Sequence, residues 1–281
     1  MAMIMDTVQR MTEADFKKLS HLIFTNYGIK MPITKKVMLE SRLRKRLQAI
    51  EIHSYKEYVD YVFSQDGIKN ELVHMIDVVS TNKTDFYRES DHFQFMTEHI
   101  LPKFLEHKSG VPLRVWSSAC STGEEAYTII FEIEEFLKDM NSFNYSIYCT
   151  DISTQVLKHG IEGIYKLDRV EKIPVEIIKK YFLKSKNPKN KTVRIIPELR
   201  KKITFNRLNL IDDVYKVPFD FDVIFCRNVL IYFDKSTQEK VINKLCNKLK
   251  KGGILFLGHS ESLTGINAPL KTIRPTIFQK I

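Results

Sequence analysis

The residues best suited to chemistry lie in a strand-to-helix connection at residues 115–127. An apolar strand there runs into small residues at 117–123, and a helix with Glu124 and Glu125 in its first turn follows. Small residues let a ligand approach the backbone, and the first N–H groups of a helix point out of its N-terminus. This arrangement is typical of a site for a nucleotide-type cofactor.

An acidic residue, Asp151, ends the next expected strand and lies 28 residues after Gly123 (151 − 123). A ribose-binding carboxylate typically follows a dinucleotide fingerprint by about 20 residues, and it accepts hydrogen bonds from ribose hydroxyls. The loop lacks the Gly-x-Gly-x-x-Gly fingerprint, so a plain structural connection is the alternative interpretation of this motif taken alone.

Three further clusters add to this motif. Residues 81–89 are polar with embedded aromatics, residues 221–233 form a buried-type strand that runs into Arg227 and Asn228, and residues 258–261 read Gly-His-Ser-Glu. Together with the Gly-Glu-Glu of the first loop, these motifs make the chain resemble the CheR family of chemotaxis receptor methyltransferases. The resemblance extends from about residue 12 to the C-terminus.

The family resemblance implies an α/β fold of the class I kind that uses S-adenosylmethionine (SAM). This fold is Rossmann-like, with a mostly parallel sheet and a C-terminal antiparallel hairpin, plus a small N-terminal all-helical domain and an inserted small antiparallel β-subdomain. The implied boundaries are 1–80 for the receptor-contacting helical domain, 81–90 for a linker that contributes to the cofactor site, and 91–281 for the methyltransferase domain. The insertion is expected at about 165–202.

The resemblance also implies residue roles. The cofactor-binding residues that it indicates are Asn82, Thr84, Arg88, Glu125, Asp151, Asn209, Leu210, Arg227 and Asn228. Arg88 and Tyr232 are the expected catalytic residues, with Arg88 near the methyl-transfer centre and Tyr232 lining its pocket. A packed core aromatic is the alternative for Tyr232, because apolar runs usually pack.

The implied reaction transfers the methyl group of SAM to glutamate carboxylates of methyl-accepting chemotaxis receptors, and it releases S-adenosylhomocysteine. A glutamate with an ordinary pKa near 4.3 is ionised at pH 7, so no general base is needed. What remains for the protein is to align the reactants and to exclude water. Arg88 is suited to hold the second carboxylate oxygen, and a structural role is expected for His259. No metal is expected.

Composition limits the other functions. The chain has 281 residues and a net charge of +10, and its four cysteines are far apart, which disfavours zinc sites and disulfides. It shows no apolar run near 18 residues and no signal peptide at its start, so we expect a cytoplasmic protein without membrane insertion.

Three other functions were weighed. A nucleic-acid methyltransferase fits the positive charge, but Cys226-Arg-Asn-Val stands where amino-group enzymes carry Asn/Asp-Pro-Pro-aromatic, so no nucleic-acid partner is expected. An NAD-dependent oxidoreductase is disfavoured by the missing glycine fingerprint and the expected terminal hairpin. A non-catalytic binding module would be expected to have lost Arg88, Asp151 or Asn228.

The first 80 residues show helical periodicity with a basic edge. In the helix expected at about 33–50, Leu39, Leu43, Leu47 and Ile50 form one apolar stripe. The adjacent arc carries the expected receptor-binding cations Lys35, Arg42, Lys45 and Arg46. In the CheR family this helix is thought to contact the acidic cytoplasmic coiled coil of the receptor; an ordinary solvated surface is the alternative.

Strands and helices alternate from about residue 90. Strands are expected at 113–116, 146–150, 203–208, 221–225 and 254–257, with helices at 124–140, from 153, and at 236–250. Gly252 and Gly253 are expected to stop the last helix, and residues 268–280 fit a terminal hairpin. A basic hairpin around 181–196 marks the insertion, which in some family members binds the receptor C-terminal peptide; a solubilising hairpin is the alternative.

Overall fold

A computed structural model describes residues 9–106, 110–138 and 143–281 of the chain. The chain divides into two compact units. The first comprises the described part of residues 1–81 together with 232–234, and the second comprises 82–231 and 235–281. Within the described residues, no helix combines the length and the apolar character needed to cross a membrane.

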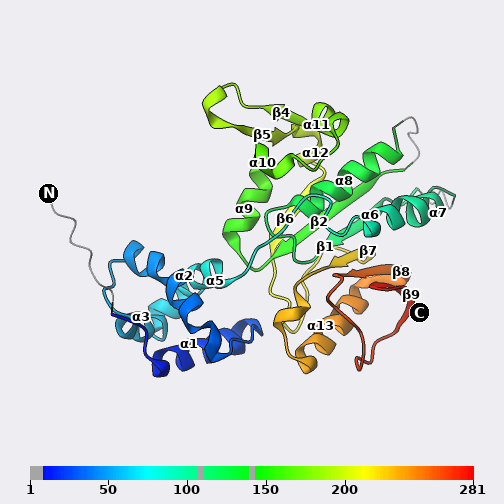
Figure 1. The fold of residues 1–281 in the computed structure, drawn as a ribbon. Helices are drawn as coiled ribbons and strands as arrows, with labels where there is room; N and C mark the ends of the chain where they lie inside the picture. The colour runs from blue at the N-terminus through cyan, green and yellow to red at the C-terminus, as the bar shows by residue number, and fades with distance from the viewer. Residues whose placement is uncertain (1–8, 107–109, 139–142) are drawn as a thin grey trace. The chain divides into compact units, whose positions relative to one another are not determined.

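The first unit is helical (Figure 1). Its elements are α1 (Glu13–Tyr27), η1 (Ile33–Lys35), α2 (Lys36–Ala49), α3 (Tyr55–Val62), α4 (Gln65–Asn70) and α5 (Leu72–Val79). The expected apolar stripe of α2 is confirmed for Leu39, Leu43 and Leu47, which are all fully buried. Ile50, the fourth expected member, is half-buried and lies just past the end of the helix as its C-cap. These leucines recur every four residues, which places them on one face of the helix.

Local capping explains where the helices of this unit begin and end. Thr12 and Asp15 form a capping box at the start of α1, and Gly28 ends that helix in the left-handed conformation with φ +69°. Gly67, by contrast, lies inside α4 and does not end a helix. A Cβ at this position would lie 1.9 Å from the Tyr61 carbonyl oxygen, so glycine allows α4 to begin directly against the end of α3.

The second unit is built on a seven-stranded sheet in the order β6-β2-β1-β7-β8-β10-β9. The strands are β1 (Leu113–Ser117), β2 (Tyr145–Asp151), β6 (Ile203–Arg207), β7 (Phe221–Cys226), β8 (Leu249–Leu257), β9 (Leu270–Arg274) and β10 (Ile277–Lys280). The first five pair in parallel, whereas β10 is antiparallel to both β8 and β9. This confirms the expected parallel sheet with a terminal antiparallel hairpin.

Helices precede and follow the strands of this sheet. Before β1 come α6 (Asp91–Phe95), η2 (Met96–Ile100) and α7 (Leu101–Glu106), whereas α8 (Glu124–Phe136), α9 (Thr154–Glu162) and α13 (Lys235–Lys248) follow β1, β2 and β7. Fully buried Ile129 and Ile130 of α8 share one core with Val115 and Phe225 of the strands. The expected helix at 124–140 therefore forms but ends at Phe136; residues 139 and 140 lie outside the described part of the chain.

The end of α13 differs from the sequence prediction. Gly252 and Gly253 were expected to stop the helix before the last parallel strand, but β8 begins at Leu249 and contains both glycines. The pairing of β7 with β8 is irregular here, because Phe221 pairs with Leu249 while Val223 pairs with Ile254. The glycine pair therefore accommodates a bulge inside the strand, where Gly252 has φ +78°.

The segment between α9 and β6 forms a small subdomain of its own, which we call the inserted subdomain (Figure 1). It contains β3 (Ile164–Lys166), α10 (Leu167–Val170), α11 (Val175–Tyr181), β4 (Phe182–Lys184), η3 (Pro188–Asn190), β5 (Thr192–Ile195) and α12 (Pro197–Arg200). The expected hairpin is present as antiparallel β4 and β5. The third strand, β3, was not expected, and it pairs with the other edge of β5.

Candidate functional site

Six of the nine predicted cofactor-binding residues lie at or soon after the ends of parallel strands: Glu125, Asp151, Asn209, Leu210, Arg227 and Asn228. Strands β1, β2 and β7 end at Ser117, Asp151 and Cys226. From β1 the chain continues outward to β2 and β6, and later through β7 to β8 on the other side, so the strand order reverses between β1 and β7. Ligands of open α/β sheets bind at the carboxyl ends of the strands at such a reversal.

Asp151 is held in place by the loop it faces. Its Oδ2 accepts a hydrogen bond from the Ser121 backbone N–H at 2.9 Å, and its Oδ1 accepts from the Ser153 N–H at 3.0 Å. The carboxylate is 7% exposed. The end of β2 and the loop between β1 and α8, which we call the cofactor loop, are thus tied together, and the aspartate has a fixed direction.

Gly123 starts helix α8 with φ +93°, a left-handed conformation that favours glycine. A Cβ here would lie 3.2 Å from both the Gly160 Cα and the Tyr165 hydroxyl, so a side chain would also be crowded. Because α8 follows the strand end through this turn, its first N–H groups reach the same edge as Asp151. The loop and the aspartate together fit an adenosine-type cofactor such as SAM.

A buried ion network lies beside this loop. Arg227 is 2% exposed in its side chain and pairs with Glu89 Oε2 at 2.9 Å and with Glu125 Oε2 at 3.1 Å. Ser117 Oγ donates to the other oxygen of Glu125 at 2.6 Å. Burial raises the pKa of Glu125, while the Arg227 charge and the hydrogen bonds oppose this rise. The predicted cofactor residues Glu125 and Arg227 are therefore neighbours.

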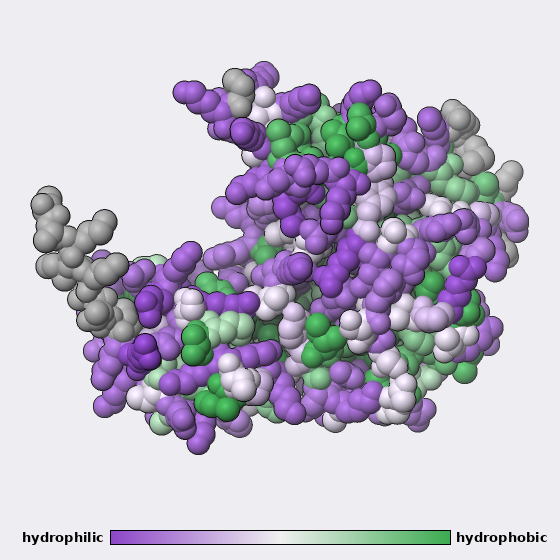
Figure 2. All heavy atoms as spheres, in the orientation of Figure 1, coloured by the Kyte–Doolittle hydropathy of each residue, from purple (hydrophilic) through white to green (hydrophobic). Residues whose placement is uncertain are grey.

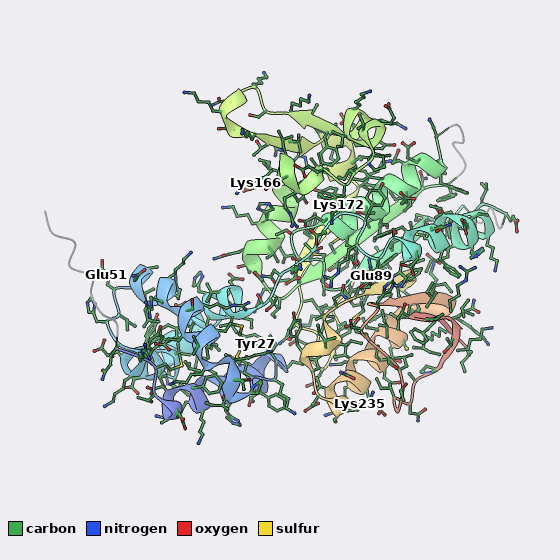
Figure 3. All side chains as sticks on the ribbon, viewed as in Figure 1. Tyr27, Glu51, Glu89, Lys166, Lys172 and Lys235 are labelled. Atoms are coloured by element: carbon green, nitrogen blue, oxygen red, sulfur yellow. The ribbon has the colours of Figure 1, made fainter. Side chains whose placement is uncertain are left out.

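Glu89, labelled in Figure 3, belongs to the linker at residues 81–90 and takes part in this network. Its Oε1 accepts from the Asn228 side-chain amide at 3.1 Å, and its Oε2 accepts from Arg227. Burial opposes ionisation of Glu89, but the Asn228 amide and the Arg227 guanidinium more than offset it and lower the pKa of Glu89 to about 2. Glu89 was not among the predicted site residues, although it follows Arg88 directly.

The loop after β7 is shaped by Glu261. Asn228 has φ +59°, and its backbone N–H donates to Glu261 Oε2 at 2.9 Å. The same carboxylate accepts from the N–H groups of Val229, Leu230 and Gly258 at 2.8, 2.7 and 2.6 Å. Glu261 lies in the Gly-His-Ser-Glu motif, but its role could not be predicted from the sequence because three of its four donors come from a loop more than 30 residues away.

The linker at residues 81–90 is hydrogen-bonded to the cofactor loop and to α8. Ser121 Oγ donates to the Asn82 backbone carbonyl at 2.9 Å, and the Tyr87 N–H donates to Thr128 Oγ1 of α8 at 3.2 Å. Arg88 Nη1 donates to the Lys83 carbonyl at 3.0 Å, and the Arg88 side chain is 35% exposed. The Arg88 guanidinium is thus held at one nitrogen by the Lys83 carbonyl, while the side chain stays partly exposed.

Asn209 and Leu210 follow β6, the strand beside Asp151. The Leu208 N–H donates to the Asp151 carbonyl oxygen at 3.0 Å, which holds the start of this loop against the end of β2. The Tyr215 hydroxyl donates to the Leu210 carbonyl at 2.6 Å, and Leu210 is buried. Both predicted residues therefore belong to the same strand-end region as Asp151.

Tyr232 groups with the helical unit, not with the sheet. The Lys30 N–H donates to the Tyr232 carbonyl at 3.0 Å, and Lys35 Nζ lies 5.8 Å from the centre of the Tyr232 ring. The predicted receptor-binding residue Lys35 therefore contacts the predicted catalytic tyrosine.

Two other predicted receptor-binding cations are engaged within their own unit. Arg42 donates to the backbone carbonyls of Val79 and Ser80 at the end of α5, the second at 3.1 Å. Arg46 makes a forked pair with Glu71 at 2.7 Å through both nitrogens, and Glu71 is 1% exposed. Lys45, by contrast, is exposed. Arg42 and Arg46 have structural partners that the helical pattern did not reveal.

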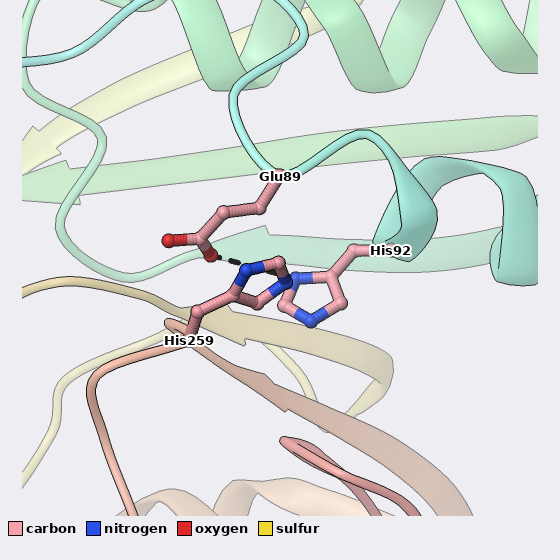
Figure 4. A group of neighbouring side chains, drawn as sticks. All are labelled: Glu89, His92 and His259. Carbon is pink, nitrogen blue, oxygen red and sulfur yellow. Dashed lines mark ion pairs between the residues drawn. The ribbon is translucent and has the colours of Figure 1, made fainter.

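Glu89, His92 and His259 form a group whose ligand atoms lie within 4.8 Å of one another (Figure 4). The buried Nδ1 of His92 has no hydrogen-bond partner among the described residues and lies 3.9 Å from Glu89 Oε2. However, Arg227 already occupies that oxygen, and Asp91 occupies His259 Nε2 at 3.0 Å. Burial and the Arg227 charge lower the pKa of His92 to about 4, and a metal cation would meet the same unfavourable field. The group fits a neutral imidazole better than a metal site.

An open cavity of about 680 Å³ lies elsewhere on the sheet. It is lined by residues of β2 and β6 and by the segment that precedes β7, including Tyr148, Thr204, Lys216 and Phe219. The lining contains none of the predicted site residues. We assign it no role.

Comparisons with known proteins agree with this geometry. Residues 82–278 match the family described as "CheR methyltransferase, SAM binding domain", and residues 14–80 match "CheR methyltransferase, all-alpha domain". The chain is 37% identical over 273 residues to a chemotaxis protein methyltransferase of Borreliella burgdorferi, covering 96% of this chain and 95% of that protein. It is 34% identical to the chemotaxis protein methyltransferase of Salmonella typhimurium, covering 94% and 90% of the two chains. The chain therefore belongs to the CheR family of SAM-dependent chemotaxis methyltransferases.

Proposed function

We propose that this enzyme methylates glutamate side chains of methyl-accepting chemotaxis receptors, forming glutamate 5-O-methyl esters during adaptation, and that it works in the cytoplasm. The observation that carries the proposal is the set of Asp151, Glu125, Arg227 and Asn228 at the strand ends of a chain that matches the SAM-binding domain of the family along residues 82–278. Relatives that cover the chain almost end to end are named chemotaxis protein methyltransferases.

The proposed chemistry asks the protein to position groups more than to move protons. Bound SAM supplies an electrophilic methyl group, and a glutamate carboxylate near pKa 4.3 is already ionised at pH 7. Asp151 holds the ribose end, while the network of Glu125, Arg227 and Glu89 fixes the loop that carries Asn228. Arg88, with its partly exposed guanidinium, is suited to orient the substrate carboxylate.

The test is transfer of radiolabelled methyl from SAM to receptor-containing membranes, with alkaline release of the label and RNA as a second acceptor. Base-labile label on the receptor is expected for the unaltered protein, with loss in Asp151→Asn and little change in Glu162→Gln, an exposed glutamate of the same unit. Label on RNA would refute the proposed substrate. Binding of SAM without transfer to any acceptor would instead indicate a silent binding module.

Docking on the acidic receptor coiled coil is proposed for the basic edge of α2. Lys45 is exposed and therefore a better probe than Arg42 or Arg46, whose loss would disturb the helical unit itself. Lys45→Glu is expected to raise the KM for receptor and to reduce its salt dependence, while SAM affinity stays unchanged. Lys56→Glu on α3 is the matched control, and an equal effect of both variants would contradict a specific docking edge.

The receptor C-terminal peptide is a second proposed partner, at the inserted subdomain. Its edge strands β3 and β4 each have one side unpaired within the three-stranded sheet, and an extended peptide can add to such an edge. Exposed Lys184 and Lys186 favour an acidic peptide. Fluorescence anisotropy with a labelled receptor tail tests this, and tight binding that persists in Lys184→Glu/Lys186→Glu would argue against the charge contribution.

A further inference from the structure

The inserted subdomain contacts the cofactor loop and the linker directly. Arg169, on α10 of the subdomain, pairs with Asp85 Oδ1 at 2.9 Å and with Glu124 Oε1 at 2.7 Å. It also donates to the Thr84 backbone carbonyl. One guanidinium thus joins three elements that are 40 to 85 residues apart in sequence: the linker, the first turn of α8 and the subdomain.

The glutamate in this contact is buried at the cofactor loop. Glu124 is 2% exposed, and its second oxygen accepts from Thr122 Oγ1 at 2.5 Å. Tyr165, on β3 of the subdomain, donates its hydroxyl to the Thr122 carbonyl at 2.7 Å. The loop between Ser121 and α8 is therefore held from the subdomain side at two points, by Arg169 through Glu124 and by Tyr165 through Thr122.

An apolar contact reinforces the polar one. Phe86 of the linker is 3% exposed, and its ring lies 4.9 Å from Tyr165 and 6.0 Å from Phe182 of the subdomain, measured between ring centres. The next residues along the linker are Tyr87, bonded to α8, and Arg88. Anything that loosens this contact would therefore release the segment that carries Thr84 and Arg88.

We propose that the inserted subdomain is part of the machinery that positions the cofactor, with Arg169 as the positioning residue. Arg169 touches no reacting atom; it fixes the linker against the start of α8, so that Thr84 and the Ser121–Asp151 contact keep their relative places. A planar guanidinium can serve three acceptors at once, which a lysine ammonium on a flexible stem does less well. This inference concerns cofactor binding and does not depend on the receptor as substrate.

The experiment measures S-adenosylhomocysteine affinity by calorimetry, without receptor, for Arg169→Gln, Arg169→Lys and the control Arg194→Gln. Arg194 is an exposed arginine of the same subdomain that donates to the Glu162 carbonyl. We expect Arg169→Gln to weaken binding about tenfold or more, which corresponds to about 1.4 kcal/mol. The affinity of Arg169→Lys should lie between those of Arg169→Gln and the unaltered protein. Arg194→Gln should bind S-adenosylhomocysteine as the unaltered protein does.

Hydrogen exchange of the linker amides is the second measurement, and its rates would not change if Arg169 only supported the fold. In Arg169→Gln the linker amides of residues 82–88 should exchange faster, while amides of the β1–β7 core stay protected. Folded Arg169→Gln with unchanged affinity and unchanged linker exchange would overturn the proposal. If Arg169→Gln fails to fold because Glu124 is left unpaired, the double variant Arg169→Gln/Glu124→Gln removes that buried charge. The cofactor affinity and the linker exchange of this double variant then test the proposal in the same way.

Discussion

Glu261→Gln tests how the loop after β7 is held in its binding shape. The carboxylate of Glu261 is 6% exposed and accepts four backbone hydrogen bonds, two on each oxygen, at 2.6 to 2.9 Å. Glutamine has almost the same size, so the substitution leaves no cavity. It replaces one acceptor oxygen by an NH₂ group, which has protons where the backbone N–H groups need a lone pair.

The expected cost follows from this count of donors. Whichever way the amide turns, one buried and one partly buried backbone N–H group lose their acceptor, and each such loss costs about 1–3 kcal/mol. The free energy of unfolding should therefore fall by about 2–6 kcal/mol. Because one of the four donors is the Asn228 N–H, at a residue with φ +59°, cofactor affinity should fall as well.

Urea unfolding and S-adenosylhomocysteine calorimetry measure the two effects, with exposed Glu162→Gln as the control for loss of a charge. Both quantities are expected to drop for Glu261→Gln and to stay nearly unchanged for the control. A loss below about 1 kcal/mol, the size of a single hydrogen bond, with unaltered affinity would refute the reasoning that this carboxylate shapes the loop.

Three further predictions use other contacts. In Gly258→Ala the new Cβ would lie 2.4 Å from Asn228 Nδ2 and 2.8 Å from its backbone N, so calorimetry should show weakened cofactor binding together with an overpacking cost of about 1–3 kcal/mol. Burial and the Arg227 charge lower the pKa of His92 to about 4, below an unfolded value near 6.5. The contribution of neutral His92 to the free energy of unfolding is therefore fully present above about pH 6.5 and declines as the pH falls toward 4. Urea unfolding between pH 7 and 5 should show this decline, and His92→Asn should remove it. Arg46→Leu leaves the buried Glu71 carboxylate without its forked partner and should cost about 3 kcal/mol in thermal or urea unfolding, whereas a change within error would mean that the pair is dispensable.

The sequence was informative wherever the signal is local. The every-fourth leucines of α2 and the strand-to-helix turn at Gly123 each depend on neighbouring residues, so a linear pattern reveals them. The same holds for the terminal hairpin of β9 and β10. These elements, together with the ordered motifs, were enough to predict the fold class and the family.

Elements that exist only through distant pairing were missed or misplaced. Strand β3 has three residues and is stable only because it pairs with β5. The glycine pair at 252 and 253 matches a helix stop in sequence, but β8 pairs with β7 on both sides of it, at Leu249 and at Ile254, so the strand continues through the glycines. In both cases hydrogen bonds to a strand far away in sequence decide the local conformation.

By itself, then, the sequence determined which elements form, their order and the residue types placed at the strand ends, because periodicity, caps and turns act over a few residues. Only the tertiary structure decided which charges are free and which are bound. Arg46 finds Glu71, Arg169 finds Glu124, and Glu261 finds the Asn228 N–H across separations of 25, 45 and 33 residues. A buried charge must be paired, and its partner is chosen by where the packed chain brings the two groups together.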